Sequence, residues 1–123
     1  MQTVSVTCSA GEIQGRVKED ALLFAGIPYA QPPVGNLRFK APQALRTFSE
    51  PYQAFKFGPA APQLPPEQGP AEPTSEDCLF LNVYTGACDD KRRPVLFWIH
   101  GGRYVSGSGR FYNGRPFVSE HDV

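Results

Sequence analysis

Residues 94–102 read PVLFWIHGG, an apolar run that ends in a histidine and two glycines. Residues 94–99 are apolar at every position, which is typical of a strand covered on both faces inside an α/β sheet. Glycines directly after such a strand let the backbone turn sharply and approach a ligand closely. Ligand sites in α/β sheets lie at the carboxyl ends of the strands. The stretch therefore predicts a central strand followed by a binding turn.

This strand and turn have a specific chemical interpretation. Ester hydrolysis passes through a tetrahedral intermediate with a negatively charged oxygen, and fixed backbone N–H groups stabilise that charge by roughly 3 kcal/mol each. A strand followed by His-Gly-Gly is how α/β-hydrolases build part of this oxyanion hole. The alternative of a glycine-rich loop without a catalytic role stays open. A phosphate loop is disfavoured, because the sequence lacks GxxxxGK[ST] and no helix-forming run follows the glycines.

Upstream of this stretch, short apolar runs separated by turn residues predict further strands. Residues 79–84, LFLNVY, form the clearest one. The polar residues 86–93 then lead into residues 94–99, so the two runs could pair as a hairpin. Earlier in the chain, alternation or short apolar runs bounded by Gly and Pro predict strands around Val4 and Val6, around Ile13 and Val17, and over residues 22–27.

The sequence supplies little to cover a buried strand. No long amphipathic helix is evident, and the nearest candidate, residues 41–57, is interrupted by Pro42 and Pro51. We therefore expect an incomplete α/β domain, with residues 96–99 as exposed apolar surface when the chain is alone. Residues 59–73 contain six prolines, which predicts an extended surface loop, either a lid or rim or an inert connection.

Composition excludes several classes of partner. Twelve acidic and twelve basic residues balance, so no net field attracts nucleic acid or anionic lipid. No run approaches the ~20 apolar residues of a membrane helix. The basic residues 91–93 lie beside Asp89 and Asp90, which indicates a solvated loop tip.

The cysteines and the first residues bear on compartment and cofactor. Cys8, Cys78 and Cys88 are odd in number and lack metal-ligand spacing, so neither a disulfide framework nor a zinc site is indicated. The first five residues lack the pattern of a secretory signal. We expect a reducing, cytoplasmic location and no cofactor.

Three motifs together resemble the type-B carboxylesterases, a family that includes the cholinesterases and bacterial para-nitrobenzyl esterases. Residues 26–39, which contain GIPYA, PPVG and LRF, look like that family's N-terminal signature. Residues 75–84, SEDCLFLNVY, look like its second signature, and residues 94–102 are similar to its strand and oxyanion segment. Their order and spacing make the resemblance far more specific than His-Gly-Gly alone.

The resemblance implies a fold and an activity. Residues 1–123 would be the N-terminal portion of a single α/β-hydrolase domain. The enzyme would hydrolyse small-molecule carboxylic esters through an acyl-serine intermediate. Gly102 and Arg103 would donate backbone N–H groups to the oxyanion, and Gly101 would shape the turn. The family usually has Gly or Ala where Arg103 stands, so this side chain could crowd the acyl site.

The resemblance also assigns structural roles. Arg38 and Glu76 match an ion pair of the family, and His100 is not the catalytic histidine. The family often pairs a cysteine near Ala61 with the one at Cys78. Alanine at that position implies that Cys78 is a buried free thiol.

The nucleophile is missing from these residues. A serine esterase needs a GxSxG elbow followed by an acid and a histidine, and the sequence contains no GxSxG. Ser106 and Ser108 lie among glycines, but neither has a glycine two residues before and two residues after it, and nothing in the sequence positions a base beside Ser108. His121 is expected to cap an element or face solvent. We therefore expect the chain to be inactive alone.

Two other interpretations compete with this one. A non-catalytic binding protein on the same fold, like the adhesion relatives of the cholinesterases, is favoured only by Arg103. A complete, small, β-rich interaction domain is the other.

Overall fold

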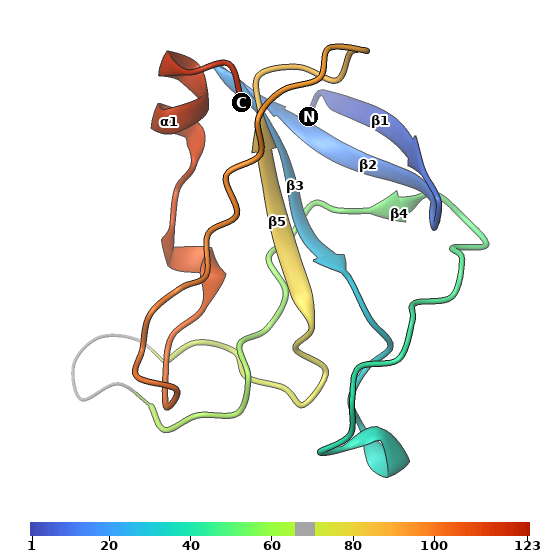
Figure 1. The fold of residues 1–123 in the computed structure, drawn as a ribbon, viewed down its shortest axis with the longest axis vertical. Helices are drawn as coiled ribbons and strands as arrows, with labels where there is room; N and C mark the ends of the chain where they lie inside the picture. Colours follow the sequence, from blue (N-terminus) through green and yellow to red (C-terminus); the bar gives the residue numbers. More distant parts are fainter. Residues whose placement is uncertain (66–70) are drawn as a thin grey trace.

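The computed structural model describes residues 1–65 and 71–123, which centre on a twisted five-stranded sheet (Figure 1). The strands are β1 (Thr3–Cys8), β2 (Gly11–Lys18), β3 (Ala21–Pro28), β4 (Tyr52–Gln53) and β5 (Phe80–Thr85). The helical elements are the 3-10 turns η1 (Gly35–Leu37) and η2 (Gly109–Phe111) and the α-helix α1 (Arg115–Glu120).

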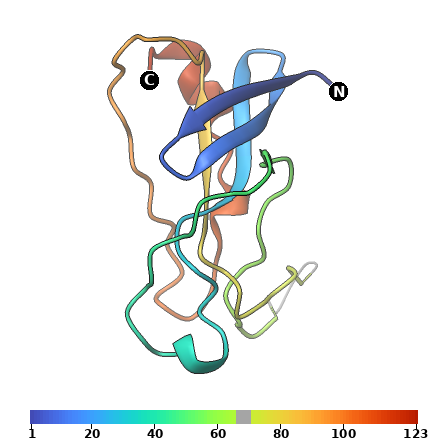
Figure 2. The ribbon, with the colours of Figure 1, turned by 90° about the vertical axis from the view of Figure 1, so that its right-hand side faces the viewer.

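The strands run β1-β2-β3-β5 in antiparallel order, with β4 parallel to β2. The pairing of β2 with β3 covers only residues 16–18 of β2, so the edge at Ile13 and Gln14 is open to β4. The β1–β2 hairpin is inclined to β3 and β5, as Figure 2 shows in the turned view. The short apolar runs of the N-terminal half therefore form strands as predicted.

Strand β5 confirms the strand predicted at residues 79–84, but its partner differs from the hairpin considered above. It pairs with β3, with Leu23 opposite Tyr84 and Leu22 opposite Thr85, and the two strands lie side by side in Figure 1. The hairpin with residues 94–99 is wrong. Those residues form no strand.

Residues 95–99 are a highly exposed apolar segment. Their exposed fractions run from 62% at Leu96 to 87% at Val95, with Trp98 at 63%. A strand forms by hydrogen bonding to a neighbour, and within residues 1–65 and 71–123 no strand lies against this segment. The predicted central strand is thus absent from the structure, while the expected exposed apolar surface is present.

Helical layers are scarce in the described part of the chain. The candidate helix at residues 41–57 is not helical; it contributes β4, and its Phe48 and Tyr52 rings stack with centroids 4.8 Å apart. Helix α1 has six residues and a proline in its first turn. The described residues are therefore a β-sheet portion of a fold rather than a layered α/β domain.

The predicted loop at residues 59–73 is only partly described, because residues 66–70 lie outside the described residues. Its two ends meet at a bridge between Ala60 and Thr74. The Ala60 N–H donates to the Pro73 carbonyl at 2.9 Å, and the Ser75 N–H donates to the Ala60 carbonyl at 2.9 Å. Ala60 itself is buried.

The core is small and lies between β2, β3 and β4. Ile13, Phe24 and Ala54 are buried there, with exposed fractions of 6% or less. A Cβ atom at Gly15 would lie 2.7 Å from the Phe24 ring, so glycine at this position makes room for the aromatic side chain.

A bulge at Gly26 joins β3 to two other elements. Gly26 has φ +73, and the β3–β5 register shifts between Phe24 and Ile27. The Gly26 N–H donates to Asn82 Oδ1 at 2.9 Å, and the Tyr52 hydroxyl donates to the Gly26 carbonyl at 2.7 Å. The bulge removes the Gly26 N–H and C=O from the hydrogen bonds between β3 and β5, and side chains bond both groups instead.

The basic residues 91–93 lie in a charge-compensated loop, as predicted. Arg93 donates two hydrogen bonds to the Asp89 carboxylate and one, at 2.6 Å, to Asp122 Oδ1. Lys91 also pairs with Asp122. Hydrogen bonding from Arg93 is the main cause that lowers the pKa of Asp89 to about 2. The ion pairs of Lys91 and Arg93 with Asp122, 31 and 29 positions further along the chain, were not predicted from the sequence.

Among residues 1–65 and 71–123, no helix combines the length and the apolar character needed to cross a bilayer.

Replacing Gly26 with alanine tests the bulge. A Cβ there would lie 2.2 Å from the Lys56 carbonyl oxygen at a left-handed φ. We expect Gly26→Ala to lower the free energy of unfolding by about 3 kcal/mol or more. Gly35→Ala is the matched control, because Gly35 has φ +54 but open space around it, and should cost about 1 kcal/mol. Urea unfolding of the longer polypeptide that contains this segment, followed by circular dichroism, measures both, and equal costs would show that the bulge does not require glycine.

The only tryptophan in the sequence, Trp98, reports on the exposed segment. In the isolated 123-residue chain we expect its emission to resemble that of indole in water and to be quenched by acrylamide, because most of its surface faces solvent. The chain should also bind a hydrophobic dye. Blue-shifted emission together with a cooperative melt and dispersed amide signals would instead indicate a complete domain.

Candidate active-site turn

Residues 100–109 form a tight turn closed by its own backbone. The Gly102 carbonyl accepts hydrogen bonds from the N–H of Val105 at 3.0 Å and from the N–H of Ser106 at 3.1 Å. Gly102 has φ +134, and Arg103 and Tyr104 follow in the left-handed region at +56 and +62. The chain therefore reverses direction directly after Gly102.

The position of Gly102 admits no side chain. A Cβ atom there would lie 1.7 Å from the Ser106 carbonyl oxygen, far inside van der Waals contact, and only glycine relieves this. A Cβ at Gly101 would meet nothing within 4 Å. The second glycine of the motif is thus the one that the geometry requires.

The turn presents two consecutive free donors. The N–H groups of Gly102 and Arg103 have no acceptor among the residues that the structure describes. Gly102 is half-buried and Arg103 is exposed. Adjacent amides left unpaired on a tight turn are what an oxyanion needs from the backbone.

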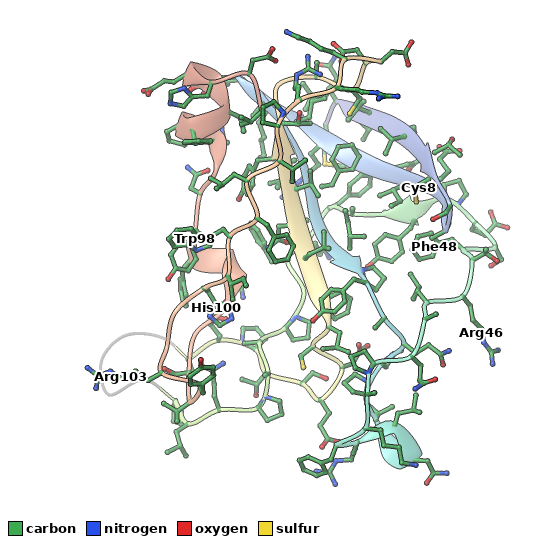
Figure 3. The ribbon with its side chains drawn as sticks, viewed as in Figure 1. Cys8, Arg46, Phe48, Trp98, His100 and Arg103 are labelled. Atoms are coloured by element: carbon green, nitrogen blue, oxygen red, sulfur yellow. The ribbon has the colours of Figure 1, made fainter. Side chains whose placement is uncertain are left out.

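Arg103 keeps its side chain outside the turn. Figure 3 shows the guanidinium directed away from the turn at its outer tip. A non-glycine residue at φ +56 is uncommon, since the left-handed region disfavours a Cβ. Backbone strain therefore accompanies this departure from the family's usual small residue.

His100 lies against the base of the turn (Figure 3). Its Nδ1 is 2.7 Å from the Gly101 carbonyl oxygen, a contact that requires the proton on Nδ1 because a carbonyl only accepts. A Cβ at Gly107 would lie 3.0 Å from the same nitrogen. The His100 ring thus contacts the backbone on both sides of the turn, which supports the structural role that we predict for it.

Ser108 has a carboxylate beside it, contrary to the expectation that no base is near. Its hydroxyl donates to Glu72 Oε1 at 3.0 Å and accepts from the Arg110 N–H at 3.3 Å, which caps η2. The glutamate lies 36 positions upstream, so sequence spacing could not reveal it. With 9% of its surface exposed, Ser108 is closed to an ester, and a cap explains its contacts.

Gln63 also contacts the turn, and nothing in the sequence pointed to it. Its Oε1 accepts from the Gly107 N–H at 2.8 Å, and its Nε2 donates to the Gly107 carbonyl at 3.1 Å. One side chain thus satisfies both backbone groups of a residue 44 positions away.

The structural pairings implied by the family resemblance are largely confirmed. Arg38 and Glu76 form the ion pair, with about half of each side chain exposed; such pairs contribute about 0–1 kcal/mol. Cys78 is unpaired but half-buried rather than fully buried. Burial, with the nearby Asp77 and Glu76, raises the pKa of its thiol, which disfavours the nucleophilic thiolate.

His121 is exposed and occupies the C-cap of α1, as predicted. Its ring lies 4.7 Å from that of Phe117, and its N–H donates to the Phe117 carbonyl at 3.0 Å. Within the described residues, no group of three or more His, Cys, Asp or Glu residues could hold a metal ion.

Comparison with known proteins gives a consistent result. The profile of the Carboxylesterase family matches residues 2–123. Phenmedipham hydrolase of Pseudarthrobacter oxydans is 41% identical over 113 residues, covering 85% of this chain and 23% of that protein. Para-nitrobenzyl esterase of Bacillus subtilis is 35% identical over 126 residues, covering 96% of this chain and 25% of that protein.

Solved structures agree with the sequence comparison. A carboxylesterase of Geobacillus stearothermophilus is 40% identical, with a TM-score of 0.86, over 97% of this chain and 24% of that one. These neighbours are carboxylesterases, which have the α/β-hydrolase fold. The chain spans about a quarter of the length of the relatives it matches.

Proposed function

The chain belongs to the carboxylesterase family, and from that premise we propose that it is the N-terminal part of a serine ester hydrolase and supplies half of its oxyanion hole. The proposal is supported by two neighbouring N–H groups, of Gly102 and Arg103, that have no acceptor among the described residues. They lie on a turn whose geometry leaves no room for a side chain at Gly102.

In the proposed reaction, the serine hydroxyl gives its proton to the catalytic histidine of the longer polypeptide as its oxygen attacks the ester carbonyl carbon, and the C=O electron pair moves onto the carbonyl oxygen. The N–H groups of Gly102 and Arg103 donate to this oxyanion, which lowers the barrier more than it strengthens substrate binding. When the pair returns to re-form C=O, the bond to the alcohol oxygen breaks, the histidine gives its proton to the leaving alcohol, and an acyl-serine remains. Water attacks this acyl group in the same manner and releases the acid.

The nucleophile, acid and catalytic histidine belong, in this proposal, to the larger part of the protein that the relatives contain and residues 1–123 do not. The sequence has no GxSxG, and Ser108 is occupied as a cap. We therefore propose that the 123-residue chain has no esterase activity alone. The three unpaired cysteines support a reducing compartment.

A non-catalytic binding protein is the second candidate, and its support has weakened. Arg103 was the residue that favoured it, because a large side chain at a normally small position could crowd the acyl site. That side chain lies outside the turn, and the amide donates regardless of it.

Gly102→Ala tests the proposal in the longer polypeptide that contains this segment. The Cβ would displace the Ser106 carbonyl and with it the amides. We expect kcat for an aryl ester to fall roughly 10²- to 10³-fold with little change in KM, as for loss of one oxyanion donor. Steady-state kinetics measures the effect.

Gly109→Ala is the control, since a Cβ there meets only Asn82 at an ordinary 3.5 Å. An unchanged kcat in Gly102→Ala would refute the assigned role. A wild-type polypeptide that neither hydrolyses esters nor reacts with a phosphonate would refute the function itself.

A further inference from the structure

The two described parts of the proline-rich segment, residues 59–65 and 71–73, both form hydrogen bonds to the candidate turn. Gln63 bonds Gly107 through both atoms of its amide group, and Glu72 accepts from the Ser108 hydroxyl. The contacts fall on consecutive residues of the returning limb of the turn. These contacts attach the proline-rich segment to the candidate turn.

The Gln63 side chain hydrogen-bonds Gly107 as a residue of a neighbouring β-strand would, with one acceptor for its N–H and one donor for its C=O. A primary amide that accepts from the N–H and donates to the C=O of the same residue holds the two peptide units on either side of that residue. The donor–acceptor distances are 2.8 and 3.1 Å, and a third bond of 3.1 Å, from Nε2 to the Ala61 carbonyl, orients the side chain. Gln63 is half-buried, so these bonds are partly shielded from competing water.

Gly107 in turn constrains the donors. A Cβ on Gly107 would lie 2.6 Å from the Gly101 carbonyl oxygen, so the two limbs of the turn are in direct backbone contact. The preceding residue, Ser106, places its carbonyl where a Gly102 side chain would be. A shift of Gly107 therefore moves the backbone that sets the direction of the Gly102 and Arg103 amides.

The segment that carries these contacts lacks the covalent closure that the family resemblance implies. Ala61 stands where relatives often have a cysteine, and Cys78 is unpaired. Hydrogen bonds hold the segment in place of a disulfide. The bonds of Ala60 with residues 73–75 join its two ends, and Gln63 and Glu72 attach it to the turn.

We propose that Gln63 is a positioning residue for the oxyanion hole, holding the turn through Gly107 so that the Gly102 and Arg103 amides converge on one point. Glu72, through Ser108, holds the adjacent residue. This inference rests on the proposed function and extends it to a residue outside the turn.

The test uses the longer polypeptide with Gln63→Leu and Gln63→Glu. Leucine removes both hydrogen bonds to Gly107, and the one to the Ala61 carbonyl, at similar volume. Glutamate keeps the acceptor for the Gly107 N–H and sets a carboxylate oxygen against the Gly107 carbonyl. We expect kcat per phosphonate-titrated active site to fall about 10- to 100-fold in Gln63→Leu, with KM within about 2-fold. Affinity for a trifluoromethyl ketone, which mimics the tetrahedral intermediate, should fall by the same factor. Gln63→Glu should also lose kcat.

Gln43→Leu is the matched control. Gln43 is exposed, and its Nε2 bonds only the Ala41 carbonyl two residues away, at 3.1 Å. It should leave kcat and ketone affinity unchanged. Counting titrated sites removes unfolded molecules from the comparison, so a loss of folded protein alone does not imitate the expected result.

The outcomes separate the two claims. If the wild type is active and both Gln63 variants keep kcat per active site and ketone affinity, the positioning role is wrong while the proposed function stands. If the wild type shows neither turnover nor phosphonate reaction, the proposed function fails and takes the positioning role with it.

Discussion

Gly26 stands at a bulge where side chains from two other elements bond both of its backbone groups. Asn82, on β5, accepts from its N–H, and Tyr52, on β4, donates to its carbonyl. Three segments that are remote in the sequence meet at this one residue, and a Cβ there would collide with the Lys56 carbonyl. The sheet order follows from this junction, because it binds β5 to β3 and holds the 52–56 segment against the same strand.

The junction also explains why the two signature motifs occur together. GIPYA supplies the glycine of the bulge, and SEDCLFLNVY supplies the asparagine that completes it. Strand β5 then leads through the 86–93 turn to residues 94–102, so the same pairing that fixes the bulge sets where the chain departs toward the candidate turn. The proline-rich segment, residues 59–73, hydrogen-bonds that turn at Gly107 through Gln63 and at Ser108 through Glu72. Hydrogen bonds of side chains, to backbone at Gly26 and Gly107 and to the Ser108 hydroxyl, thus join the fold and the candidate turn.

Strands with a local signal could be predicted from the sequence. The runs at β1, β2, β3 and β5 are bounded by glycine or proline and alternate or cluster in apolar residues, so their existence could be predicted. Features that depend on a partner elsewhere in the chain could not. Residues 94–99 have the composition of a buried strand, yet pairing needs a neighbour, and among the described residues there is none. The contacts of Gln63 and Glu72 span 44 and 36 positions and carry no periodic pattern, so only the structure reveals them.

In the proposed function, two backbone amides, at Gly102 and Arg103, face the charge that develops on an attacked ester carbonyl. A crystal structure of the longer polypeptide, with its nucleophilic serine phosphonylated, tests this directly. We expect the phosphoryl oxygen to lie about 2.7–3.1 Å from both nitrogens. A phosphoryl oxygen bound by side chains or water instead, with both amides turned away from it, would contradict it.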